Sequence, residues 1–127
     1  MRQNKYEEAI VKYTSAIDLS ANAIFYCNRA AAYSKVGRHS DAVEDSKNAL
    51  KIDAKYSKAY ARMGFAYLNM HKYEEAKDAY ENALTIDPTN QSYKDNLDAV
   101  KEKLTVGPTN PMQAFGAGAG EFIISVE

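Results

Sequence analysis

Cysteine and excess charge are both scarce in this sequence. Cys27 is the single cysteine among 127 residues, which excludes an intrachain disulfide and a cluster of thiolate metal ligands. The formal net charge is −1, so the chain as a whole has no attraction for nucleic acid or an anionic membrane. Apolar runs stay below the roughly 18 residues that a spanning helix needs, and the polar start of the chain is no signal peptide. We therefore expect a cytoplasmic protein that neither binds nucleic acid nor inserts into a membrane.

Residues that could carry catalysis or hold a cofactor are also few. His39 and His71 both fall in predicted turns, without the cysteine or paired carboxylates of a metal site. Cys27 lies in an apolar, aromatic stretch, where a free cysteine is usually a packed small residue rather than a nucleophile. The sequence also offers no glycine-rich phosphate loop after a strand. We expect no catalytic residue, no metal and no cofactor, and therefore a protein that is not an enzyme.

Apolar residues recur at helical spacing through most of the chain. Near the start they follow the i, i+3, i+4, i+7 pattern from Tyr6 to Ile17, which is typical of an amphipathic helix. The same pattern predicts further helices, six in all, over residues 6–19, 23–36, 41–52, 57–70, 73–86 and 91–104. The expected N-caps are Asn22, Ser40 or Asp41, Ser57 and Asn90, and the expected helix ends lie at Gly37 and Asp87-Pro88.

One unit of this pattern occurs twice, 34 residues apart. The matching residues are Tyr26 with Tyr60, Ala30 with Gly64, Tyr33 with Tyr67, Ala42 with Ala76, and Ala49 with Ala83. A partial unit precedes them, in which Ala9 stands 33 residues before Ala42. Small residues at fixed positions let partner helices approach closely, so that each antiparallel pair stacks on the next. The predicted fold is an all-α stack of antiparallel helix pairs with a C-terminal capping helix.

These residues resemble the tetratricopeptide repeat (TPR) family. The third unit supplies most of the family's loose pattern, in Tyr60, Met63-Gly64, Tyr67, Ala76, Tyr80, Ala83 and Pro88. The second unit departs from it with Ser46 in place of an aromatic residue and Ala54 in place of the proline. The resemblance implies a right-handed superhelical TPR solenoid over residues 1–104. Its parts would be the second helix of repeat one (1–22), repeat two (23–56), repeat three (57–90) and a capping helix (91–104).

In such solenoids the first helix of each pair lines a concave groove. Lys58 and Arg62 are four residues apart on one face, and Asn28 occupies the same repeat position as Arg62. Charge-assisted donors pair well with carboxylates, and an asparagine amide can bond both a carboxylate and a peptide backbone. We therefore predict that Asn28, Lys58 and Arg62 bind an acidic peptide; the alternative is that they are solvated surface groups. Further predicted lining residues are Arg2, Lys35, Phe65 and Asn69.

Several stretches sharpen the resemblance. CNRAAAY and YSKAYARMG are similar to the carboxylate-clamp class of TPR domains, and IFYCNRAAAYSKVG with QSYKDNL resembles the small glutamine-rich TPR co-chaperones. The resemblance implies an adaptor that holds the C-terminal Glu-Glu-Val-Asp tails of the seventy- and ninety-kilodalton heat-shock chaperones. Three of the family's five clamp residues carry over, as Asn28, Lys58 and Arg62. The other two belong to a first helix of repeat one, which we expect this chain to lack.

Without that helix, the apolar stripe of residues 6–19 would be partly uncovered. Burying one large side chain contributes roughly 1.5–3 kcal/mol, so we expect this edge to fray, to self-associate or to be covered by another segment. Two other functions stay open. One is a scaffold that binds partners through apolar surface without a clamp, and the other is a regulatory TPR module cut from a larger enzyme.

The composition changes after residue 104. Residues 105–127 hold four of the six glycines and two of the three prolines, which favours a flexible tail or a remnant of expression or processing. The chain ends in Val126-Glu127, which is similar to the Val-Asp end of a chaperone tail. This terminus is therefore a second candidate for covering the exposed edge or for filling a neighbouring molecule's groove.

Overall fold

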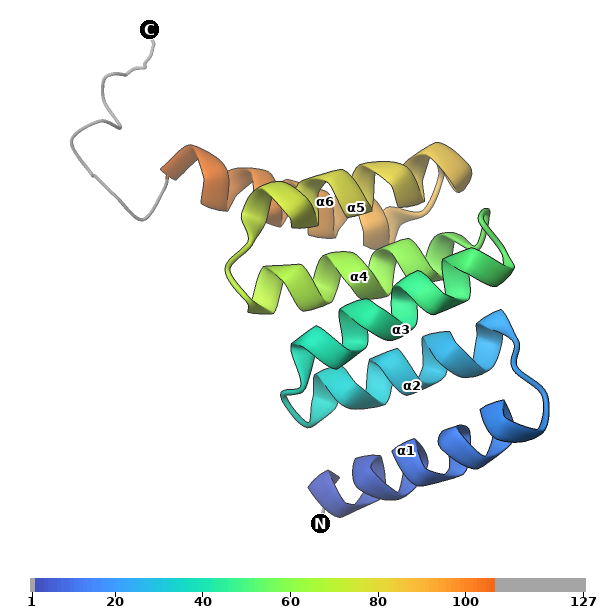
Figure 1. Ribbon diagram of the computed structural model, residues 1–127. Coiled ribbons are helices and arrows are strands. Elements are labelled where there is room, and N and C mark those ends of the chain that lie inside the picture. The colour runs from blue at the N-terminus through green and yellow to red at the C-terminus, as the bar shows by residue number, and fades with distance from the viewer. Residues whose placement is uncertain (1, 107–127) are drawn as a thin grey trace, which may run out of the picture.

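The computed structural model describes residues 2–106, and side chains within residues 5–105. This part of the chain contains six helices joined by short turns (Figure 1). Their bounds are α1 Arg2–Leu19, α2 Ala23–Lys35, α3 His39–Ile52, α4 Ser57–Asn69, α5 Tyr73–Ile86 and α6 Gln91–Val106. Each predicted helix is present, and α1 begins four residues earlier than its apolar pattern predicts. The predictions about the tail of residues 107–127 lie outside the described residues.

The helices stack along one direction, with each helix packed on its neighbours in the chain (Figure 1). α2 pairs with α3 and α4 pairs with α5, while α3 joins the two pairs and α6 packs on α5. α2 also contacts α4, so that the first helices of successive pairs lie side by side. The predicted all-α stack of helix pairs is confirmed. Within residues 2–106, no helix combines the length and apolar character that a membrane crossing requires.

Helix ends follow the predicted chemistry at some turns and not at others. The side chain of Asn22 accepts a hydrogen bond from Phe25 N at 2.9 Å, and that of Asn90 accepts one from Tyr93 N at 3.1 Å. The caps predicted at Ser40 or Asp41 and at Ser57 are wrong. The N-cap positions there belong to Arg38 and Tyr56, which make no side-chain capping bond, and the predicted residues lie inside the helices. The turns after α2 and α4 both need a left-handed residue, which is Gly37 (φ 84°) in one and His71 (φ 62°) in the other.

Alanines fill the contacts between helices, as the repeat pattern predicts. Those with no exposed surface are Ala30, Ala42, Ala49, Ala59, Ala66, Ala76 and Ala83. α4 and α5 approach closely at Gly64, where an added Cβ would lie 2.8 Å from the ring of Tyr80. Tyr80 is itself almost fully buried. Gly64 therefore carries no side chain because the large ring of Tyr80 occupies the space. The corresponding residues of repeat two are Ala30 and the smaller Ser46.

An ion pair that the sequence reading missed joins the first three helices. Arg29 on α2 binds both carboxylate oxygens of Asp45 on α3, through Nε at 2.6 Å and Nη2 at 2.9 Å. Arg29 Nη1 also donates to the hydroxyl of Thr14 on α1 at 2.9 Å. Asp45 is buried, with 2% of its surface exposed. Because this pair touches α1 as well as α3, it fixes the first helix to the rest of the stack.

The first helix is only partly covered. Within the described residues α1 packs on α2 alone, and Ile10 is its buried apolar residue, while Val11 and Leu19 are largely exposed. Tyr6, Ala9 and Tyr13 line an open cleft between α1 and α2. Fraying, self-association and coverage by another segment remain predictions for this edge.

Candidate peptide-binding cleft

A cleft of about 260 Å³ lies between α4 and α6. Lys58, Arg62 and Phe65 line it from one face of α4, at the spacing that places side chains on consecutive turns. The remaining lining residues are Ala61, Tyr80, Asn90, Ser92, Tyr93 and Asn96. This lining contains two cations, several hydrogen-bonding groups and no carboxylate. Its composition suits an anionic ligand.

The guanidinium of Arg62 has unused hydrogen-bonding capacity. Its Nε atom is buried, yet no partner for it occurs in the part of the chain that the structure describes. Such a buried donor without a partner costs roughly 1–3 kcal/mol, which a ligand that accepts its hydrogen bond would recover. Lys58 is exposed one turn earlier on α4. Within residues 5–105 the ion pairs are Arg29–Asp45 and Arg38–Asp41, so neither cation of the cleft is paired there.

The groups around Arg62 are held neutral. Burial raises the pKa of the Cys27 thiol above its usual value, although the nearby charges of Arg62 and Lys58 oppose this shift. Burial likewise raises the pKa of Tyr80 to about 12, against the opposing charge of Arg62. Because both groups stay protonated near neutral pH, they do not compensate the positive charge of Arg62 and Lys58. Cys27 is fully buried, which matches the prediction of a packed small residue.

The capping helix supplies groups that the sequence reading did not assign to the site. Ser92, Tyr93 and Asn96 on α6 line the cleft opposite α4. The hydroxyl of Tyr93 lies 3.4 Å from that of Ser57. The available signal was the spacing of Tyr93, Asn96 and Leu97, which puts these residues on the inward side of an otherwise polar helix.

The other predicted lining residues lie elsewhere. Asn28 is half-buried on α2 and, with Lys35, lines a second cleft of about 220 Å³ against Tyr6, Ala9 and Tyr13 of α1. The structure therefore brings Lys58, Arg62 and Phe65 together, but places Asn28 and Lys35 in a neighbouring cleft. Asn69 is exposed and donates to the backbone oxygen of Phe65 at 2.8 Å, outside both clefts. The side chain of Arg2 lies outside the described side chains.

Models of the repeat match three parts of the chain, and two of these parts overlap at residues 23–37. A tetratricopeptide repeat model matches residues 57–90, a second one matches residues 23–56, and a TPR repeat model matches residues 1–37. The chain belongs to the tetratricopeptide repeat family. The two units that the 34-residue spacing indicates coincide with the two matched repeats.

Curated relatives confirm the likeness to small glutamine-rich TPR proteins. The chain is 42% identical over 95 residues to the small glutamine-rich tetratricopeptide repeat-containing protein 2 of Mycosarcoma maydis. The aligned region covers 74% of this chain and 27% of that protein. It is 46% identical over 91 residues to the protein of the same name from Saccharomyces cerevisiae, covering 71% and 26% of the two chains. The TPR chain thus spans about a quarter of the length of these relatives.

Solved structures show the same fold at similar identity. The Sgt2 TPR domain from Aspergillus fumigatus is 36% identical with a TM-score of 0.77, covering 100% of this chain and 81% of that one. The first TPR of Spaghetti (RPAP3), bound to the HSP90 peptide SRMEEVD, is also 36% identical with a TM-score of 0.76, covering 81% and 82% of the two chains. One of these structural relatives therefore binds a peptide that ends in Glu-Glu-Val-Asp.

Proposed function

We propose that this TPR chain is a non-enzymatic co-chaperone adaptor whose cleft between α4 and α6 binds the acidic C-terminal tail of a heat-shock chaperone. The observation that carries the proposal is the pair Lys58 and Arg62, two cations without an ionic partner within the described residues, in a cleft that the neutral Tyr80 also lines. The neutral Cys27 lies near both cations but outside the lining of the cleft. Related TPR structures bound to HSP90 and HSP70 peptides that end in EEVD support it.

The residues suggest a division of roles. Arg62 and Lys58 donate charge-assisted hydrogen bonds to carboxylates, and the buried Nε of Arg62 gains the acceptor that it lacks. Asn96 offers an amide from α6, and Phe65, which is 43% exposed, offers apolar surface for the valine that precedes the last aspartate. Asn28 lies on α2, next to α4, and binds the peptide backbone where the peptide leaves the cleft. Ligand binding through these partly exposed charges weakens as salt increases.

Titration calorimetry with a peptide that ends in Glu-Glu-Val-Asp tests the proposal. The Lys58→Ala, Arg62→Ala double variant is expected to lose measurable binding, and binding by the unaltered chain is expected to fall as salt is raised. The matched control is Lys51→Ala, Lys101→Ala, which removes two exposed lysines elsewhere on the molecule and leaves binding unchanged. Equal binding by the two double variants would contradict the proposal.

A second candidate function is an apolar scaffold, and the cleft between α1 and α2 favours it. Tyr6, Ala9, Tyr13, Ala31 and Ala32 make most of this cleft apolar. A partner that enters there would bind through buried apolar area, and its affinity would change little with salt. Salt-insensitive binding that survives the loss of Lys58 and Arg62 would therefore favour the scaffold over the clamp.

A further inference from the structure

Repeats two and three place different residues around the same pair of tyrosines. Tyr26 and Tyr33 of α2 correspond to Tyr60 and Tyr67 of α4, 34 residues later. Between them, Arg29 in repeat two corresponds to Met63 in repeat three. On the second helix of each pair, the corresponding residues are Asp41 and Glu75, Glu44 and Asp78, Asp45 and Ala79, and Asn48 and Asn82. Both repeats therefore have the two tyrosines, two acidic residues and an asparagine. Only repeat two has the central cation and its buried carboxylate.

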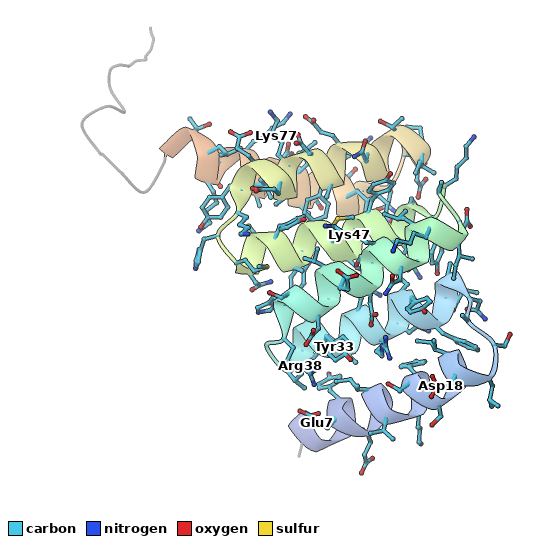
Figure 2. The ribbon with its side chains drawn as sticks, in the orientation of Figure 1. Glu7, Asp18, Tyr33, Arg38, Lys47 and Lys77 are labelled. Carbon is cyan, nitrogen blue, oxygen red and sulfur yellow. The ribbon has the colours of Figure 1, made fainter. Side chains whose placement is uncertain are left out.

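In repeat two a guanidinium fills the space between the tyrosines. The Cζ atom of Arg29 lies 5.7 Å from the ring centroid of Tyr26 and 5.6 Å from that of Tyr33. Both distances are within the range of cation–π attraction. A second guanidinium, of Arg38, lies 4.6 Å from the centroid of Tyr33, and these two residues lie near one end of α2 (Figure 2). The chain thus shows which chemical group this tyrosine pair accepts.

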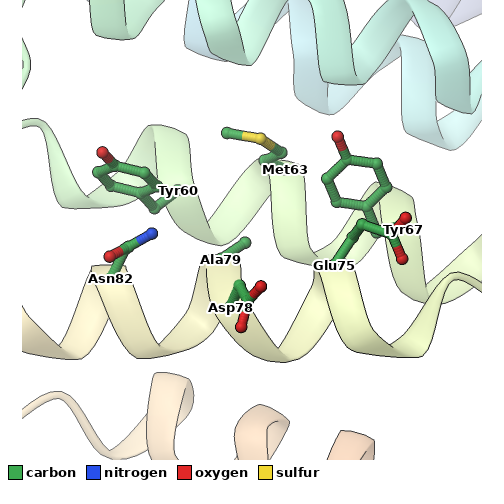
Figure 3. A pocket seen from close by; sticks show the side chains of 7 residues that line it. All are labelled: Tyr60, Met63, Tyr67, Glu75, Asp78, Ala79 and Asn82. Atoms are coloured by element: carbon green, nitrogen blue, oxygen red, sulfur yellow. The ribbon is translucent and has the colours of Figure 1, made fainter.

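In repeat three the corresponding space is an open cleft of about 200 Å³. Figure 3 shows Tyr60, Met63 and Tyr67 along α4, facing Glu75, Asp78, Ala79 and Asn82 along α5. Met63 ends in a thioether and Ala79 in a methyl group, so neither supplies the charges of Arg29 and Asp45. Glu75 and Asp78 are exposed, and neither forms an ion pair within the described residues. The cleft therefore has two carboxylates and two phenol rings around an apolar floor of Met63 and Ala79, with no cation among its lining residues.

We infer that this cleft between α4 and α5 is a docking site for an arginine side chain of a partner protein. The guanidinium would stack between Tyr60 and Tyr67, as Arg29 does between its own tyrosines, and would pair with Glu75 and Asp78. With about 3.6 residues per helical turn, Tyr60, Met63 and Tyr67 lie on the side of α4 opposite to Lys58 and Arg62. The site is thus separate from the proposed peptide cleft, opposite in charge, and able to bind while that cleft is occupied.

The repeat correspondence predicts one cation, Lys47, beside this site. Thr14 on α1 contacts Arg29 of repeat two. Lys47 on α3 corresponds to Thr14 by the 33-residue spacing of repeats one and two, so it is expected near Met63, the residue that corresponds to Arg29. Lys47 is exposed and is not among the lining residues of the cleft. Its single positive charge opposes an incoming guanidinium, whereas Glu75 and Asp78 together attract it. Replacing Lys47 with serine should therefore tighten the binding of an arginine probe, by roughly threefold for one exposed charge.

An NMR titration of the full chain with acetyl-Gly-Arg-Gly-amide tests the inference. The ring signals of Tyr60 and Tyr67 are expected to shift and saturate, and the control peptide, with citrulline in place of arginine, keeps the shape without the charge. Asp78→Asn should weaken binding of the arginine peptide roughly fivefold. Equal shifts with both peptides, no shift, or shifts centred on other residues would overturn the inference.

A second variant fills the cleft from inside. Met63→Arg with Ala79→Asp copies the Arg29–Asp45 pair of repeat two into repeat three, and should keep the helical circular dichroism signal while abolishing the shifts at Tyr60 and Tyr67. The same variant should still bind the Glu-Glu-Val-Asp peptide, because Lys58 and Arg62 lie on the other side of α4. Undiminished binding of the arginine peptide by this variant, or by Asp78→Asn if the double variant does not fold, would contradict the docking site.

Discussion

Repeats two and three have the same arrangement of helices, but different kinds of residues pack between those helices. Repeat two has small residues at one pair of corresponding positions, Ala30 and Ser46, and the buried ion pair Arg29–Asp45 at another. Repeat three has a large ring, Tyr80 over Gly64, at the first pair of positions and the apolar pair Met63 and Ala79 at the second. In each case two positions differ together, because a change at one alone leaves a clash, a hole or an unpaired charge. A repeat position therefore fixes where a side chain lies, but its partner decides which chemistry fits there.

The difference also separates two tasks. The polar pair of repeat two reaches Thr14 and holds α1, the helix with the least cover in the described chain. The buried, neutral Tyr80 of repeat three lines the cleft together with Lys58 and Arg62. Repeat two thus secures an edge of the solenoid, and repeat three builds the cleft that we propose binds the peptide.

The largest effect is expected from breaking the polar pair of repeat two. Arg29→Ala leaves Asp45 buried without its partner, which should lower the free energy of unfolding by about 3–5 kcal/mol. Urea denaturation followed by circular dichroism measures this loss. The double variant Arg29→Met, Asp45→Ala copies repeat three, and should recover most of the loss because no buried charge remains. A double variant as unstable as the single one would contradict the coupling.

The buried phenol of repeat three predicts a loss of stability at alkaline pH. The pKa of Tyr80 is about 12 in the fold and its ordinary value is 10.0, so its contribution is complete below pH 10 and is lost as the unfolded form ionises toward pH 12. The free energy of unfolding should fall by about 2–3 kcal/mol over that interval. Comparing Tyr80→Phe with the unaltered chain isolates this contribution, and parallel pH profiles for the two proteins would contradict it.

The close approach at Gly64 gives the next effect. Gly64→Ala adds a methyl group 2.8 Å from the ring of Tyr80 and should destabilise the chain by about 1–3 kcal/mol, although alanine favours a helix more than glycine does. Adding Tyr80→Ser gives the residue pair of repeat two, Ala30 and Ser46. In that background, Gly64→Ala should no longer lower the free energy of unfolding. Thermal unfolding of the four proteins in this cycle would show the coupling. Additive effects of the two substitutions would count against it.

The smallest effect is expected at the turns that end α2 and α4. His71 adopts a left-handed conformation that Gly37 adopts without strain in repeat two. His71→Gly should therefore raise the free energy of unfolding by about 1 kcal/mol or less, because it also removes the 2.8 Å hydrogen bond to the hydroxyl of Tyr73. Gly37→Ala is the matched opposite change and should destabilise. If Gly37→Ala raised the free energy of unfolding, the left-handed conformation of the turn would not be what determines the stability at this position.

Much of the fold could be predicted from sequence because the same residue pattern occurs in two units of the chain. The 34-residue spacing, the alanines and the caps at Asn22 and Asn90 place the helices and their pairing. The pair Arg29–Asp45 was missed because its members are 16 residues apart on different helices, and helical periodicity does not say which long side chains meet. A signal existed, since both residues are charged where repeat three has Met63 and Ala79.

The site was partly predictable for the same reason. Lys58 and Arg62 share a helix face, so their spacing alone brings them together. Asn28 has the repeat position of Arg62, but the structure places it in a cleft against α1, since an equivalent position on another helix faces different neighbours. The contribution of Asn96 depends on how α6 docks, which its sequence pattern does not specify.

In the proposed function, the unpaired charge of Arg62 binds the terminal carboxylate of the peptide. The most direct measurement is a double-mutant cycle by titration calorimetry, in which Arg62→Ala is combined with a peptide whose C-terminal carboxylate is converted to an amide. Each change is expected to weaken binding, and the two together should cost at least about 1.5 kcal/mol less than the sum of the single losses, as for a hydrogen bond to a charged group. Strictly additive losses would show that Arg62 and the carboxylate do not meet.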